Sequence, residues 1–217
     1  MATIRYAERK DCPVILQFIK ELAEYEKEPD AVEATEAMLE ESLFDKSQAK
    51  VVLLEEEGES LGFALYFYNF STWRGKAGLY LEDLYVRPQY RGKGYGKMLL
   101  SFLANQAEKE GCPRFEWIVL DWNTPSINFY KSKGAKPLDE WTVFRLENQE
   151  LKNLAEEYRK NYSWISNIIS SFCLGVICSA FFQYLLCPIE RLRPAKTSRP
   201  LKSATLKNFV EWRFPPK

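Results

Sequence analysis

The stretch LYLEDLYVRPQYRGKGYGK, residues 79–97, indicates how this chain folds. Residues 79–86 are mostly apolar or aromatic and predict a strand, which ends at Pro88 because proline cannot donate to a β-ladder. The turn Arg91–Gly96 contains three glycines and leads directly into a helix. Because the N–H groups and the dipole at a helix N-terminus favour an anion, this turn predicts a site for a pyrophosphate.

The glycine turn alone leaves its function open. Its spacing matches neither a P-loop, which needs Gly-Lys followed by Ser or Thr, nor the dinucleotide fingerprint with its acidic residue about 20 positions further on. A tight strand-to-helix connection that binds no ligand is an equally simple interpretation. The residues on either side of the turn are therefore needed to distinguish a pyrophosphate site from a connection that binds no ligand.

The flanking sequence predicts short strands and amphipathic helices. Apolar residues at helical spacing after Asp11 indicate a first helix, Thr35 begins a second, and Gly58 lies in a hairpin turn. Thr124 followed by proline is typical of a helix start. In chain order we expect strands at residues 4–7, 51–54, 61–68, 79–86, 115–120 and 142–146, and helices at 11–25, 35–43, 96–111, 124–134 and 149–158. The order up to residue 146, βααβββαβαβ, followed by the closing helix, predicts an α/β (α+β) fold, a mixed central sheet with helices on both faces.

The chain changes character after this predicted domain, residues 1–160. Residues 161–189 carry no charge, and residues 164–187 are long enough to span a bilayer, although serine, asparagine and glutamine dilute them. Residues 190–217 are basic and unpatterned, so we expect disorder. The apolar segment is interpreted as a membrane anchor, a helix packing on a partner, or an extension without selected structure. The last is slightly favoured, and membrane contact is not.

Charge and composition limit the function. Residues 161–217 hold 8 Lys and Arg against 2 Asp and Glu, whereas the whole chain has 30 of each, so the first 160 residues are acidic. An acidic domain disfavours nucleic acid as a partner and suits a small cationic substrate. The chain has no histidine, and its five cysteines lack C-x-x-C spacing, so we expect no metal site. No signal peptide is evident at the N-terminus, and we expect a cytoplasmic protein.

Several motifs together resemble one known family. The run Arg91-x-x-Gly94-x-Gly96 is similar to the acetyl-CoA signature of the GNAT superfamily of N-acetyltransferases. The stretches 80–83, 90–92, 121–123 and 125–130 resemble its diamine acetyltransferase branch, which includes thialysine and spermidine/spermine N-acetyltransferases. Residues 71–73 look more like the thialysine enzymes. The resemblance covers about residues 3–158 and implies a GNAT-like sheet, acetyl-CoA as co-substrate and a homodimer, whereas the tail from Arg159 matches nothing in the family.

The resemblance also implies roles for individual residues. Glu82 would remove the proton of the substrate amine, through water, and Tyr130 would protonate the leaving thiolate. The implied coenzyme contacts are Leu84, Tyr85, Val86, Arg91, Gly92, Lys93, Gly94, Tyr95, Gly96, Lys97, Asn123, Thr124, Pro125 and Ser126. The implied substrate contacts are Tyr25, Glu26, Ser71, Thr72 and Glu82.

The chemistry of acetyl transfer asks for such groups independently of any family. An alkylammonium with a pKa near 10.4 must lose a proton before it attacks a thioester, which costs about 4.6 kcal/mol at neutral pH. A carboxylate such as Glu82 can accept this proton, and a phenol such as Tyr130 can donate one. In the alternative, Glu82 and Glu26 are solvated surface charges and Tyr130 is a core aromatic. We expect an enzyme that acetylates an amine of a small lysine-like or polyamine substrate, and a substrate of the thialysine type is favoured. The alternatives are a protein or peptide N-acetyltransferase and a non-catalytic scaffold that binds acetyl-CoA.

Overall fold

The computed structural model describes the backbone of residues 1–173 and the side chains of residues 1–161. The chain divides into two units, Met1–Pro137 and Leu138–Lys217, and each is considered by itself. The sequence interpretations for residues 174–217 lie outside the described residues, so the roles suggested for the tail stay predictions. In the part of the chain that is described, no helix is long and apolar enough to cross a membrane.

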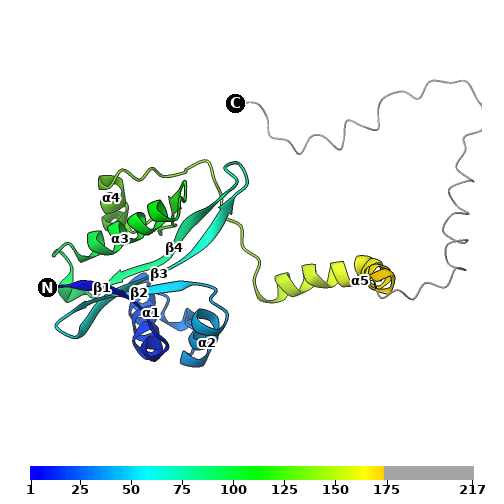
Figure 1. The fold of residues 1–217 in the computed structure, drawn as a ribbon, viewed down its shortest axis with the longest axis horizontal. Coiled ribbons are helices and arrows are strands. Elements are labelled where there is room, and N and C mark those ends of the chain that lie inside the picture. Colours follow the sequence, from blue (N-terminus) through cyan, green and yellow to red (C-terminus); the bar gives the residue numbers. More distant parts are fainter. Residues whose placement is uncertain (174–217) are drawn as a thin grey trace, which may run out of the picture. The chain divides into compact units, whose positions relative to one another are not determined.

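Five strands form one mixed sheet in the first unit, with the spatial order β1-β2-β3-β4-β5. Neighbouring strands are antiparallel, except that β4 and β5 are parallel. Figure 1 shows the long β3–β4 hairpin running through the middle of the unit. The strands are β1 (Thr3–Tyr6), β2 (Lys50–Glu56), β3 (Glu59–Ser71), β4 (Lys76–Val86) and β5 (Phe115–Glu116). The predicted mixed sheet is thereby confirmed.

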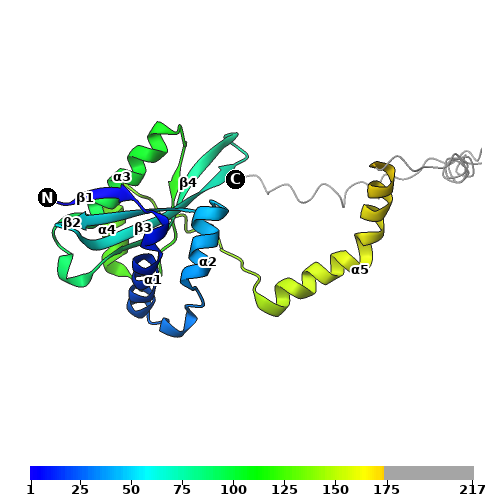
Figure 2. The ribbon, with the colours of Figure 1, turned by 60° about the horizontal axis from the view of Figure 1, so that its bottom comes forward.

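Helices cover both faces of this sheet, as predicted (Figures 1 and 2). They are α1 (Cys12–Glu26) and α2 (Glu36–Glu40) on one face and α3 (Tyr95–Lys109) and α4 (Thr124–Ser132) on the other; α5 (Asn148–Cys173) belongs to the second unit. Four short helical turns also occur, at Arg9–Asp11, Pro29–Ala31, Glu41–Asp45 and Pro88–Tyr90. Thr35 caps α2 as expected, because its hydroxyl accepts the backbone N–H of Met38.

Two apolar clusters fill the spaces between the sheet and the helices. On the α1 face, Phe18 and Phe63 are fully buried and stack with ring centroids 5.4 Å apart. On the α3 face, Leu81 packs with Leu99 and other buried leucines. Burying a side chain of this size contributes about 1.5–3 kcal/mol, so the two clusters hold β4 firmly between the helix layers.

Two strand predictions were wrong, one in the length of the strand and one in its existence. The strand expected at residues 115–120 pairs with β4 only through Phe115 and Glu116. No strand forms at residues 142–146, because they find no ladder partner among the described residues, and a strand without a partner is not stable in water. The helix expected at 149–158 does form, as part of the longer α5.

The β3–β4 pairing is interrupted by a β-bulge at Glu82. Leu65 faces Asp83 and Tyr66 faces Leu81, so Glu82 has no partner across the ladder. A bulge of this kind shifts by one residue which side chains face each side of the sheet. Leu81 therefore packs on the α3 side, whereas Asp83 shares the face of Tyr85, which packs on the α1 side.

Candidate active site

A cavity of about 470 Å³ lies where β4 ends. It is bounded by the last turn of α1, the second half of β4, the turn that follows it, the start of α3, residues 118–120 and helix α4. Sixteen of the residues singled out by the resemblance line this single cavity: Tyr25, Glu26, Glu82, Leu84, Tyr85, Val86, Arg91, Gly92, Gly94, Tyr95, Gly96, Lys97, Asn123, Pro125, Ser126 and Tyr130. Residues distant in sequence are thus gathered at one site, although this grouping leaves their roles as predictions.

The cavity exists because β4 loses its neighbour partway along its length. The parallel pairing with β5 covers only Leu79 and Tyr80 of β4. Beyond the bulge, the strand has no ladder partner on that edge among the described residues, and residues 118–120 line the cavity instead. In a strand with one open edge, alternate N–H groups remain available to a ligand. The stretch Glu82–Val86 can therefore offer backbone donors to a ligand in the cavity.

The glycine turn leaves open space for a ligand. Gly92 and Gly94 have φ angles of 79° and 87°, in the left-handed region that side chains disfavour, and no atom lies within 4 Å of a Cβ built on either. Gly94 is the N-cap of α3 and supplies no side-chain cap. The first N–H groups of α3 are thus without a side-chain acceptor from their cap, and Lys97 adds a positive charge to the cavity.

Arg91 ties the turn to the sheet. Its Nε donates to the backbone oxygen of Val86 at 2.8 Å. Its guanidinium carbon lies 4.7 Å from the ring centre of Tyr25 and 5.5 Å from that of Tyr85. Such cation–π contacts hold a guanidinium between two rings. Arg91 thereby positions the start of the turn against β4 and the end of α1.

Asn123 connects the two sides of the cavity. Its buried side-chain oxygen accepts the backbone N–H of Ser126 at 3.3 Å and the hydroxyl of Tyr25 at 3.1 Å. Because a backbone N–H can only donate, the oxygen position of this amide is determined, and its NH₂ group is left to donate. The asparagine thus caps α4 and links it to the end of α1.

Tyr130 presents a protonated phenol to the cavity. Its ring packs against Trp117 and Phe129, with centroids 4.9 Å and 5.3 Å apart. Burial, helped by the charge of Glu26 and by Tyr25, raises the pKa of Tyr130 to about 12. The hydroxyl therefore keeps its proton throughout the neutral range and is available as a proton donor.

Three carboxylates line the cavity without a protein partner. They belong to Glu26, Glu82 and Asp83, and none has a hydrogen bond or ion pair with any side chain that the structure describes. Burial, with the charges of Glu82 and Glu26, raises the pKa of Asp83 to about 7. Burial also raises the pKa of Glu26. This wall of the cavity is thus suited to a cation.

Sequence reasoning missed several residues of the cavity. Asp83 is the chemically important one, and its adjacency to Glu82 was the only signal, because alternation along a regular strand would have directed the two side chains to opposite faces. The others are apolar wall residues: Leu22, Ile118, Val119, Leu120 and Phe129. The sequence predicts residues 118–120 as part of a strand, whereas in the structure they line the cavity without pairing to β4.

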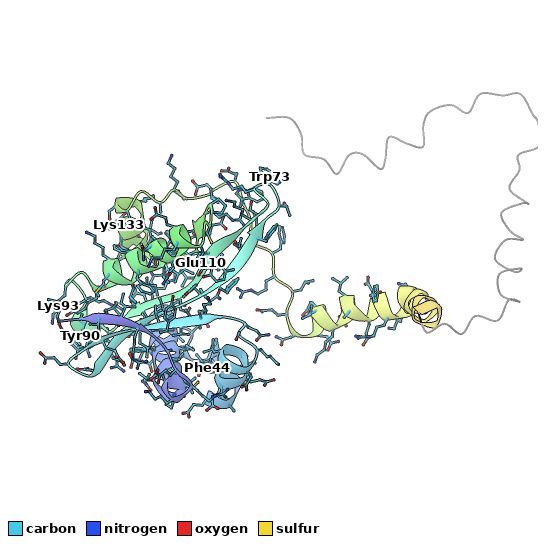
Figure 3. The ribbon with its side chains drawn as sticks, viewed as in Figure 1. Phe44, Trp73, Tyr90, Lys93, Glu110 and Lys133 are labelled. Carbon is cyan, nitrogen blue, oxygen red and sulfur yellow. The ribbon has the colours of Figure 1, made fainter. Side chains whose placement is uncertain are left out.

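Four residues implied by the resemblance do not line the cavity. Ser71 and Thr72 lie at the end of β3 and in the turn before β4. Figure 3 shows the neighbouring Trp73 at the tip of this hairpin, with Tyr90 and Lys93 at the opposite end of the unit. Lys93 is the third of the four residues, and it lies over the ring of Tyr90, with 5.4 Å between its Nζ and the ring centre. Thr124 is the fourth. Their contacts with substrate or coenzyme stay predictions.

Among the side chains of residues 1–161, no group of three or more acidic, cysteine or histidine residues could hold a metal ion.

The chain is similar to known acetyltransferases in sequence and in structure. The protein family described as "Acetyltransferase (GNAT) family" matches residues 15–135. The thialysine N-epsilon-acetyltransferase of Sus scrofa is 40% identical over 164 residues, covering 70% of this chain and 96% of that protein. The spermidine/spermine N(1)-acetyltransferase-like protein 1 of Homo sapiens is 39% identical over 165 residues, covering 71% of this chain and 24% of that protein. Among solved structures, an integron cassette protein of V. cholerae aligns with a TM-score of 0.62 and 31% identity, covering 71% of this chain and 97% of that one.

Proposed function

This chain belongs to the GNAT acetyltransferase family and is an enzyme that transfers acetyl groups, and from that premise we propose that it acetylates a primary amine of a small cationic molecule, with acetyl-CoA as the donor. The acceptor is a lysine-like or polyamine molecule, and the thialysine type is favoured. The observation that carries this proposal is the joining of an anion-suited turn and a wall of unpaired carboxylates in one cavity. The first suits a pyrophosphate and the second an ammonium group.

The residues at the coenzyme end fit acetyl-CoA. The N–H groups at the start of α3, with Lys97 and Arg91 beside them, suit the pyrophosphate. The open edge of β4 supplies backbone donors, and the free amide NH₂ of Asn123 suits a carbonyl oxygen of the pantetheine arm. Bound acetyl-CoA would supply the activated thioester. We also propose a homodimer, which light scattering of the full chain tests by its mass.

The chain's own residues would then carry out three tasks. Glu82, exposed at the bulge, takes the proton of the ammonium group through water and leaves a nucleophilic amine. The backbone N–H of Val86, which points to the open edge of β4, stabilises the negative charge that develops on the thioester oxygen. Tyr130 gives its proton to the departing thiolate, and the proton that the acylated nitrogen loses as the amide forms restores the phenol.

We expect Tyr130→Phe to lower kcat by about 10²-fold, because the proton donor is removed while the ring remains to pack against Trp117. Acetyl-CoA affinity, measured by calorimetry, should stay within about twofold of the parent protein, since no coenzyme contact is assigned to the hydroxyl. Tyr158→Phe, on the exposed face of α5, is the matched control and should leave kcat unchanged. A kcat for Tyr130→Phe equal to that of the control would exclude the tyrosine as the acid.

The function itself is tested with the full-length protein in two steps. Calorimetry with acetyl-CoA should give a saturable heat with one site per chain. An acceptor screen with thialysine, spermidine, lysine and an N-terminal peptide should then give turnover with a small cationic amine. Turnover only with the peptide would replace the small-molecule assignment by protein acetylation, and heat without any turnover would favour a binding scaffold.

A further inference from the structure

The two half-buried carboxylates of the cavity, Glu26 and Asp83, differ from the other partly buried carboxylates that the structure describes. Asp11 and Glu55 both pair with Arg5, at 2.6 Å and 2.8 Å. Glu21 pairs with Arg87 at 3.1 Å. Glu26, Glu82 and Asp83 have no such cation among the described residues. Withdrawing a carboxylate from water without a partner is costly, so it tends to keep a proton until a cation arrives.

Asp83 is the member of the three that is most strongly affected. The bulge at Glu82 places Asp83 on the same face as Tyr85, which packs against Phe18 of α1. On a regular strand, Asp83 would instead share the face of Leu81 and point into the apolar cluster beneath α3. The bulge therefore brings Asp83 to the side of the sheet where α1 ends in Glu26.

The charges around Asp83 favour its neutral form. Burial acts first, and repulsion from Glu82 and then Glu26 adds to it, which together raise the pKa of Asp83 to about 7. The arginine that lines the cavity, Arg91, is occupied by Val86 and two tyrosine rings. The other titratable groups that line the cavity are Tyr25 from α1, Tyr85 from β4, Tyr95 and Lys97 from α3 and Tyr130 from α4.

We propose that Asp83 is a specificity-determining residue of the amine site, holding a proton in the empty cavity and releasing it to solvent when an ammonium group binds. This inference rests on the proposed function, because the ligand is the cationic acceptor. The ammonium group keeps all three of its protons on binding. Asp83 changes from a carboxylic acid to a carboxylate paired with that ammonium, and one proton passes to the buffer, so the process is balanced without any further reactant.

This exchange makes the affinity for the amine depend on pH. An alkylammonium stays charged well above neutral pH, so its own titration does not contribute. Below the pKa of Asp83, entry of the amine must displace a proton, and the affinity falls by about tenfold per pH unit. Above that pKa the carboxylate is already ionised and the affinity levels off. Between pH 8 and pH 6 we expect the dissociation constant for the amine to rise by about tenfold.

The test is calorimetric titration of the full-length protein with thialysine, in the presence of saturating coenzyme A so that no acetyl transfer occurs. At pH 6.5 the heat is measured in two buffers with different ionisation enthalpies, and the difference gives the number of protons released. With a pKa of about 7, Asp83 is about three quarters protonated at pH 6.5, so the parent protein should release about 0.75 proton per amine. Acetyl-CoA binding and turnover are measured on the same preparation.

Three variants locate the proton. Asp83→Asn should abolish the release and flatten the pH dependence, with coenzyme A affinity unchanged. Glu24→Gln removes a carboxylate from an exposed position on α1 outside the cavity. This variant should release as many protons per bound amine as the parent protein. Glu26→Gln should retain a release, because Asp83 is still buried beside Glu82.

Each contrary outcome has one meaning. An unchanged release in Asp83→Asn, or a release lost only in Glu26→Gln, assigns the proton elsewhere and overturns the inference. If Asp83→Asn does not fold, the parent protein decides alone, since a dissociation constant independent of pH between 6 and 8 also overturns it. Turnover without proton release removes this inference and leaves the acetyltransferase intact, whereas failure to bind acetyl-CoA removes the proposed function as well.

Discussion

Glu82→Gln is expected to lower kcat by about 10² to 10⁴-fold, the range that a positioned general base contributes. Glutamine keeps the size and the hydrogen-bonding capacity of the side chain at the bulge, but it cannot take up a proton at neutral pH. The ammonium group then has to lose its proton to water, against a cost of about 4.6 kcal/mol at neutral pH. Steady-state kinetics with the best acceptor of the screen measures this change.

Two further measurements separate this role from a structural one. Raising the pH should restore part of the lost activity of Glu82→Gln, because more of the free amine is then present in solution. Glu57→Gln, in the exposed turn between β2 and β3, is the matched control and should keep the parental kcat. A Glu82→Gln variant with parental kinetics would falsify the assignment of Glu82 as the base.

Phe63→Ala is expected to destabilise the protein by about 3–5 kcal/mol, the usual cost of emptying a phenylalanine site in a packed core. The Phe63 side chain is fully buried and stacks on Phe18, with an interplanar angle of 4°. Phe63 also faces Tyr85 across the β3–β4 ladder, so its loss loosens the strand that lines the cavity. Thermal unfolding should show a midpoint lower by about 10 °C, at about 2–4 °C per kcal/mol for a chain of this size.

The same strand provides the control for this prediction. Phe70 lies further along β3, and its side chain is 62% exposed. Phe70→Ala should change the free energy of unfolding by no more than about 0.5 kcal/mol, as exposed positions usually do. Equal effects of the two substitutions would contradict the assignment of Phe63 to the core of the first unit.

Local patterns explain which parts of the fold were predictable. The helix cap at Thr35, the hairpin turn at Gly58 and the glycine turn after β4 all depend on residues within a few positions of one another. The cap of α4 was predicted one residue too late, because Asn123 rather than Thr124 supplies it. Caps and turns of this kind carry their own chemistry, so their sequence signals are reliable. The length of a strand depends instead on ladder partners far away in the chain. The strand predicted at residues 115–120 is therefore shorter than expected, and the strand predicted at 142–146 does not form.

Within the candidate site, sequence resemblance brought most of the lining residues to notice and missed the electrostatics. It pointed to Glu82 and Tyr130, but it contained no indication that Asp83 lies in the same cavity or that Tyr25 bonds to Asn123. It also implied Ser71 and Thr72 as substrate contacts; they lie at the end of β3 and in the following turn and do not line the cavity, so these contacts stay predictions.

The amino-acid sequence by itself determined the family, the order of most elements and the anion-suited turn, because each depends on short motifs or on periodicity within one element. Only the tertiary structure decided where β4 separates from its neighbour, which face Asp83 occupies and which carboxylates lack a cation. Register and burial depend on partners far away in the chain, and the charge state of a carboxylate depends on the water and the charges that those partners exclude or supply.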